Sequence, residues 1–194
     1  LEQAQVAPRV RAVVEQEIQG LRALFEQALR PPRSLIAFDG HPGNFIVRAD
    51  GSAVLVDLEK CRYAYPGLDL AHATLYTSTT WDLHTQAVLS PNEVVAAYRA
   101  WAYAAGPLAA ASLAWQMPLR RAMWLWSITW CAKWRVLSQQ QASVSAGGED
   151  WSAERSDDRL VTHVRERVDH YLSEVVVEQV RSGFDPLERA INAA

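Results

Sequence analysis

The stretch FDGHPGN, residues 38–44, is the most unusual segment of the sequence. It interrupts the aliphatic run SLIAF with an aspartate, two glycines, a proline and an asparagine, and the chain then resumes at once as FIV. A simple chain reversal needs fewer special residues. This composition is typical of a loop that holds polar groups still beside a strand, which makes Asp39 and Asn44 candidate site residues.

Outward from this loop, the sequence predicts a few short strands within a mostly helical chain of 194 residues. Strand-like apolar runs are found at 35–38, 45–48 and 53–56. Helical spacing of apolar residues, with proline or serine signals at the ends, predicts helices at 8–29, from about 68, at 90–105, from about 108 to 138, at 151–181 and at 185–192. We therefore expect a mainly α fold with a small β-hairpin cluster (α+β).

The dipeptide Asp50-Gly51 is a strong signal for a two-residue hairpin turn. With such a turn, residues whose numbers sum to 101 face each other, so that Asn44 pairs with Asp57. Directly opposed side chains lie on one face of the hairpin with their Cβ atoms roughly 4.5–5.5 Å apart. The other face is apolar and is expected to anchor the hairpin in the core; it comprises Phe45, Val47, Val54 and Val56.

The predicted pair of Asn44 and Asp57 has the chemistry of a metal site. Two oxygen ligands on neighbouring strands suit a hard cation such as Mg²⁺, which takes one or two protein oxygens and completes its shell with water and phosphate. Asp39 lies five residues before Asn44 in the sequence and brings a second carboxylate toward the same place. These three residues are therefore the expected centre of a functional site.

This order of residues is the layout of a kinase catalytic loop and its metal-binding aspartate. It consists of an aspartate, an asparagine five residues later, a hairpin and a further aspartate. The blocks DGHPGNFIV, VLVDLEKC and YPGLDLA follow one another with suitable gaps. Over about residues 35–73 the chain resembles the aminoglycoside phosphotransferase family and its choline-kinase-like relatives. The resemblance implies the C-terminal lobe of a protein-kinase-like phosphotransferase.

The resemblance also implies an activity and roles for residues. The γ-phosphate of ATP would pass to a hydroxyl of a small molecule, with Asp39 as the catalytic aspartate that orients the hydroxyl or accepts its proton. Asn44 and Asp57 would hold the Mg²⁺ ions that bridge the ATP phosphates, and Asp69 and His41 would support the loop. Relatives phosphorylate aminoglycosides, choline, sugars and other metabolites, so the acceptor is not specified.

The chain departs from the family pattern in two ways. Ala37 stands where the family has a histidine, and Phe38 replaces a small residue. The sequence contains neither GxGxxG nor GxxxxGK[ST], and its two lysines, Lys60 and Lys133, do not suit the lysine of a nucleotide-binding strand. We expect residues 1–194 to form a single C-terminal catalytic lobe that is inactive alone. The N-terminal nucleotide-binding lobe would be absent from this chain and would act in cis.

Composition excludes several other classes of protein. The net charge of −3 and the pI near 6.0 give no sign of a nucleic-acid partner. Cys61 and Cys131 form neither a disulfide framework nor a CxxC site, so we expect a reducing compartment, the cytoplasm. The apolar stretch 123–131 is too short to span a membrane and is flanked by basic residues.

Several alternatives stay open at this stage. A non-catalytic binding or scaffold module that has lost nucleotide chemistry is the second functional hypothesis, although such a module has no need of three converging site residues. Acidic residues would either attract a cationic acceptor or form a solvated surface; they are Asp82, Asp150, Asp157 and Asp158. The tryptophans at 126, 130 and 134 are expected in the core rather than as a substrate platform, and Trp124 is expected to be partly exposed.

Overall fold

The computed structural model describes residues 1–27, 29–84, 86–139 and 158–193, and it is mostly helical. The helices are α1 (Pro8–Gln27), α2 (Gly67–Thr74), α3 (Tyr76–Thr79), α4 (Pro91–Ala105), α5 (Pro107–Ser112), α6 (Gln116–Gln139), α7 (Asp158–Tyr171), α8 (Glu174–Ser182) and α9 (Phe184–Asn192). The strands are β1 (Ser34–Ile36), β2 (Phe45–Val47), β3 (Ala53–Leu55) and β4 (Arg62–Ala64). They form two antiparallel pairs, β1 with β4 and β2 with β3. The expected mainly α fold with a small β component is confirmed.

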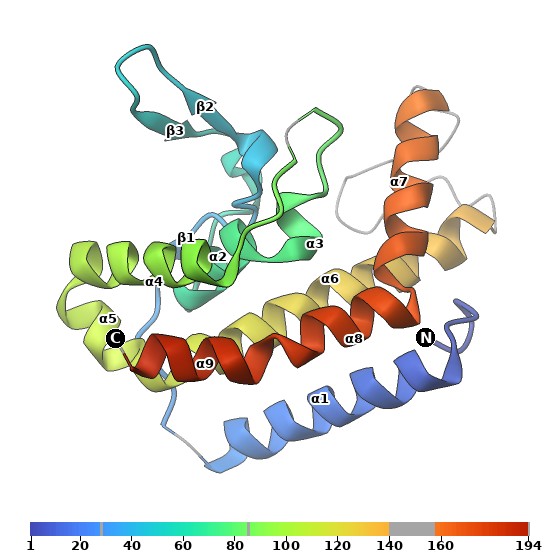
Figure 1. The fold of residues 1–194 in the computed structure, drawn as a ribbon, viewed down its shortest axis with the longest axis horizontal. Helices are drawn as coiled ribbons and strands as arrows, with labels where there is room; N and C mark the ends of the chain where they lie inside the picture. The colour runs from blue at the N-terminus through green and yellow to red at the C-terminus, as the bar shows by residue number, and fades with distance from the viewer. Residues whose placement is uncertain (28, 85, 140–157, 194) are drawn as a thin grey trace.

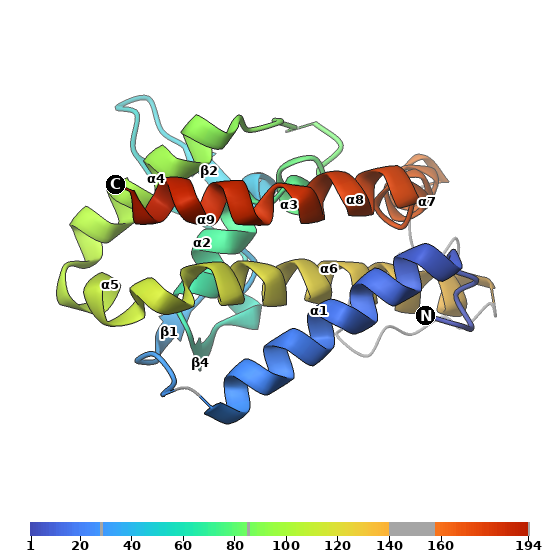
Figure 2. The ribbon, with the colours of Figure 1, turned by 60° about the horizontal axis from the view of Figure 1, so that its bottom comes forward.

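Helix α6 is the centre of the helical body. Figure 2 shows it between α1 on one side and the row formed by α8 and α9 on the other. Its side chains Met123, Trp124 and Ile128 are fully buried, and the Trp124 ring packs edge-on against Phe184 at a centroid distance of 5.8 Å. The expectation that Trp124 is partly exposed was wrong. Because α6 has neighbours on several sides, its buried surface is wider than a single stripe.

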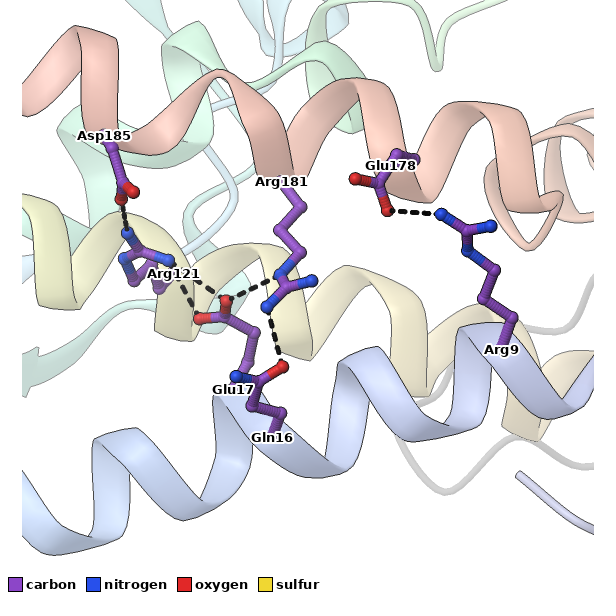
Figure 3. Close-up of polar contacts among 7 residues, drawn as sticks. All are labelled: Arg9, Gln16, Glu17, Arg121, Glu178, Arg181 and Asp185. Atoms are coloured by element: carbon purple, nitrogen blue, oxygen red, sulfur yellow. Dashed lines mark hydrogen bonds and ion pairs between the residues drawn. The ribbon is translucent and has the colours of Figure 1, made fainter.

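A network of charged side chains joins four of these helices (Figure 3). The buried carboxylate of Glu17 on α1 accepts two hydrogen bonds from Arg121 on α6, at 3.0 and 3.1 Å, and one from Arg181 on α8 at 3.4 Å. Arg121 also contacts Asp185 on α9 at 2.6 Å. The network therefore holds α1, α8 and α9 against the central helix.

The β2–β3 hairpin has a different register from the one predicted. Each residue of β2 faces a residue of β3 one position earlier than expected, so that Phe45 pairs with Leu55. The loop has three residues, 49–51, because Gly51 adopts a left-handed conformation with φ +82° after the turn. Asn44 therefore lies opposite Val56, whose N–H donates to the Asn44 carbonyl at 2.8 Å, and the prediction that Asn44 faces Asp57 was wrong.

The hairpin also does not anchor in the core. The side chains of Ile46 and Val47 are 56% and 71% exposed, and Figure 1 shows the hairpin projecting away from the helices. On the face expected to be buried, Phe45 and Val47 are 37% and 71% exposed and Val54 and Val56 are half-buried, so the prediction that this face anchors the hairpin in the core was wrong.

Other differences from prediction concern the ends of elements. The pairing of β4 with β1 was not predicted, and the helix expected from about 108 to 138 is divided into α5, a short 3₁₀ turn and α6. The helix expected at 151–181 is interrupted before α8, where the Ser173 hydroxyl accepts from the Val176 N–H as an N-cap. The start of α4 is as predicted, with Ser90 and Glu93 forming a capping box. Asp150 and Asp157 lie outside the described residues.

Candidate functional site

The loop between β1 and β2 begins in a strained conformation. Phe38 has φ 62°, which is rare for a bulky residue. The Asp69 carboxylate on α2 accepts hydrogen bonds from the N–H groups of Ala37 and Phe38, both at 2.8 Å. The Phe38 ring also packs edge-on against Trp126 and lies under the Arg62 guanidinium, at centroid distances of 5.3 and 4.0 Å. These contacts hold the backbone immediately before Asp39 in one conformation.

The environment of Asp69 acts on its carboxyl group in two directions. Burial raises the pKa of Asp69, and the neighbouring Asp39 carboxylate raises it further. The two backbone hydrogen bonds oppose this effect because they favour the charged form. Through these two hydrogen bonds Asp69 holds the backbone before Asp39, which is the position expected for a residue that supports the loop.

The second half of the loop is a short 3₁₀ turn, Pro42–Asn44, with His41 as its N-cap. The His41 ring accepts from the Gly43 N–H at 3.1 Å, and the Asn44 side-chain amide donates to the Asp39 carbonyl at 2.9 Å. A Cβ atom at Gly43 would lie 2.6 Å from a carboxylate oxygen of Asp82, so only glycine fits without a shift. The turn therefore fixes the Asn44 side chain, which is buried beside Asp39.

Asp57 reaches the same place from the end of β3. It adopts a left-handed conformation, φ 59° and ψ 62°, which aspartate tolerates better than most residues. Asp39, Asn44 and Asp57 all line one cavity of about 450 Å³. The structure thus brings the three predicted residues together at one cavity, although not through the strand pairing that was predicted.

Lys60 is a site residue that the sequence did not identify. Its ammonium nitrogen lies 2.9 Å from Oδ2 of Asp39, and the two side chains are only 19% and 11% exposed. The sequence excluded Lys60 as a strand lysine, but its position three residues after Asp57 was the available signal. The Asp39 carboxylate is therefore in contact with a cation, the Lys60 ammonium group.

The described residues contain no group of three or more His, Cys, Asp or Glu side chains placed to hold a metal ion. The donor set at this cavity, an amide oxygen and a carboxylate, fits instead a Mg²⁺ ion that takes most of its ligands from water and phosphate. The hydrogen bond of Asn44 uses its amide nitrogen and not its oxygen. Asn44 and Asp57 are thus the residues that could hold such an ion.

Most of the rest of the cavity is formed by α2, α3, α6 and α7, and the sequence did not predict it. Buried His72, Thr77 and Ser78 come from α2 and α3. The half-buried rings of Trp126 and Trp130, on α6, pack against the core as expected and also line the cavity. The run TSTT at 77–80 was the available signal, because four hydroxyl side chains in a row are unusual for a buried helix.

His72 is the most strongly perturbed imidazole at the cavity. It is 5% exposed, and burial lowers its pKa to about 4, while the nearby Lys60 and His41 act in the same direction and Asp39 opposes them. The ring is therefore neutral near pH 7 in the folded protein.

The lowered pKa of His72 predicts a loss of stability in acid. The unfolded chain binds a proton on this ring below about pH 6.5, and the folded protein binds it only near pH 4, so the stability falls as the pH falls between these values. We expect a loss of about 2 kcal/mol between pH 7.5 and pH 5 from this residue. Urea unfolding of the wild type and of His72→Gln at both pH values measures it. An equal pH dependence in the two proteins would contradict the assignment.

Comparison with known proteins agrees with this geometry. Residues 1–113, more than half of the chain, match the model of a family described as a phosphotransferase enzyme family. Neither a curated protein nor a solved structure matches the chain. In the part of the chain that the structure describes, no helix is long and apolar enough to cross a membrane.

Proposed function

Because the chain belongs to the phosphotransferase enzyme family, we propose that it is the catalytic lobe of a kinase-like enzyme that transfers the γ-phosphoryl group of ATP to a hydroxyl of a small molecule. The observation that supports this most strongly is the common cavity of Asp39, Asn44 and Asp57. The contacts of Asp69 with the backbone before Asp39 support it too, because phosphoryl transfer depends mainly on positioning.

In this proposal Asp39 acts on the acceptor. Its carboxylate orients the attacking hydroxyl and takes the proton as the new oxygen–phosphorus bond forms and the bond to the ADP oxygen breaks. Lys60 contacts Oδ2 of Asp39, so Oδ1 is the oxygen assigned to the hydroxyl. The Lys60 ammonium also places a positive charge next to the phosphoryl group in transit.

Asn44 and Asp57 are the residues proposed to hold Mg²⁺. When bound, Mg²⁺ neutralises charge on the phosphate oxygens of ATP. The hydrogen bond from the side-chain nitrogen of Asn44 to the backbone carbonyl of Asp39 ties the metal ligand to the base, so that both would keep their spacing during the reaction. The left-handed conformation of Asp57 turns the chain out of β3 and toward the cavity.

Residues 1–194 would form a single C-terminal lobe, and an N-terminal lobe outside this chain would complete the ATP site. The exposed apolar hairpin supports this part of the proposal, because Ile46 and Val47 offer a surface for another element to cover. The chain alone would then have little activity. We place the enzyme in the cytoplasm, where ATP is available and where Cys61 and Cys131, both free, would stay reduced.

Metal binding gives a direct test that does not need the acceptor. We expect Mn²⁺, used as a probe for Mg²⁺ and followed by its paramagnetic signal, to bind the chain in the presence of ATP. Asp57→Asn should weaken this binding about tenfold or more, since one of two protein ligands loses its charge. Asp50→Asn is the matched control, because Asp50 is fully exposed in the hairpin loop.

The result would count against the proposal if Asp57→Asn and Asp50→Asn bound Mn²⁺ with equal affinity. Asn44→Ala gives a second reading of the same site. The non-catalytic alternative predicts no metal-dependent ATP binding in any of these variants.

A further inference from the structure

Three buried polar side chains of the cavity have no hydrogen-bond partner for one of their atoms within the described residues. They are Nδ1 of His72, Oγ1 of Thr77 and Oγ of Ser78. The residues are only 5%, 4% and 1% exposed. A buried polar atom without a partner costs about 1–3 kcal/mol. Three such groups beside one cavity therefore indicate that something within the cavity is their partner.

Aromatic side chains line the same cavity, and the His72 ring packs edge-on against Trp126 at a centroid distance of 5.9 Å. Trp126 and Trp130 lie one turn apart on α6, and Trp81 packs edge-on against Trp130 at a centroid distance of 5.2 Å. Tyr171 on α7 contacts Trp81 at 6.2 Å. Such rings offer flat apolar surface together with polar edges. A matching ligand has apolar faces, formed by C–H groups, and polar groups around its rim.

Among the buried polar side chains that line the cavity in the described residues, Asp39 is the one that carries a charge. Of the carboxylates that line it, Asp57 and Glu59 are exposed, Asp82 is half-buried and Asp39 is in contact with Lys60. His72 is neutral near pH 7 because burial lowers its pKa to about 4. A polycationic ligand would leave its ammonium groups without carboxylates here, and burying an unpaired charge is costly. Hydroxyl groups, in contrast, can both donate to and accept from the neutral side chains.

We infer that the part of the cavity between α3 and α6 is the acceptor subsite, and that the acceptor is a neutral polyhydroxylated compound such as a sugar or a polyol. Thr77, Ser78 and His72 bind its hydroxyl groups, and Trp126 and Trp130 pack on its C–H faces. One further hydroxyl faces Asp39. The reaction at that hydroxyl rests on the proposed function, but the binding does not. The cavity volume of about 450 Å³ is within the range of small-molecule sites.

The test measures binding alone, without ATP or metal. Tryptophan fluorescence of the full chain follows titration with neutral compounds (glucose, ribose, myo-inositol and sorbitol) and with cationic hydroxyl compounds (choline and kanamycin). We expect at least one neutral compound to give a saturable change. The double variant Thr77→Val/Ser78→Ala should weaken that binding about tenfold or more. It should not unfold more easily, because the deleted hydroxyl groups have no partner in the described residues.

Thr79→Val is the matched control. Thr79 is on the same helix, is 2% exposed and also has an unpartnered hydroxyl within the described residues, but it lines a second cavity of about 400 Å³ between α3, α4 and α9. Its variant should bind the neutral compound as the wild type does. The inference is overturned if no neutral compound binds, if only the cationic compounds bind, or if the double variant binds as tightly as Thr79→Val.

These outcomes separate the subsite from the proposed reaction. Sugar binding without metal-dependent ATP binding would support the subsite and contradict the phosphotransferase proposal. Mn²⁺ binding at Asn44 and Asp57, with no binding of any neutral compound, would support the phosphotransferase proposal and contradict the subsite.

Discussion

Asp39→Asn is expected to lower the rate of phosphoryl transfer from ATP by about 10²–10⁴-fold, the usual contribution of a positioned acid–base group. The amide cannot take the proton of the acceptor, although its shape is nearly that of the carboxylate. The Asn44 amide should still find its acceptor, because it bonds to the Asp39 backbone carbonyl and not to the side chain. Metal affinity should therefore change much less than the rate. ADP release by the chain together with the N-terminal lobe that we propose, with Mg²⁺ and with water or a sugar as acceptor, measures the effect.

The same substitution removes the carboxylate that Lys60 contacts at 2.9 Å, so a loss of rate alone does not separate a lost base from a damaged loop. The double variant Asp39→Asn/Lys60→Met separates these causes. It removes both charges of the pair, and we expect its unfolding free energy to exceed that of Asp39→Asn alone. Its transfer rate should stay low. Recovery of the rate together with the stability would show that Asp39 acts only through the loop.

Local signals in the sequence were enough for the elements that depend on neighbours in the chain. The proline at the start of α4, the serine before it and the glutamate three residues later define that helix start without any tertiary contact. The hairpin was also found, but its register was not. Asp50-Gly51 is compatible with a two-residue and a three-residue loop, and the choice between them moves every cross-strand pair by one residue.

The site was predictable where it depends on chain connectivity. Asp39 and Asn44 lie five positions apart in one loop, and Asp57 follows the strand that returns beside it, so the three meet under either register. The helical wall was not predictable, because Ser78, Trp130 and Tyr171 are far apart in the sequence. Their common cavity exists only once α3, α6 and α7 have packed. Tryptophans at helical spacing look alike in the sequence whether a core or a ligand covers them.

Glu17→Ala is expected to destabilise the protein by about 2–4 kcal/mol, the largest stability effect we predict. The Glu17 side chain is 10% exposed and accepts bonds from two guanidinium groups, those of Arg121 and Arg181, which are 20% and 30% exposed (Figure 3). Without the carboxylate, these two cations lie near each other with little access to water. Urea unfolding at neutral pH measures the loss.

The ion pair between Arg9 and Glu178 is the matched control, because it joins the same helices α1 and α8 in the same view (Figure 3). Its side chains are 69% and 47% exposed and 3.8 Å apart, so Glu178→Ala should cost less than about 1 kcal/mol. Burial, and not the number of charges, then decides which ion pair holds α1 against its neighbouring helices. Trp126 and Trp130 of the cavity also lie on α6. Glu17→Ala should lower binding at the cavity only by reducing the fraction of folded protein. The affinity of the folded protein for the ligand should be unchanged. Equal losses of stability in Glu17→Ala and Glu178→Ala would refute this account of the network.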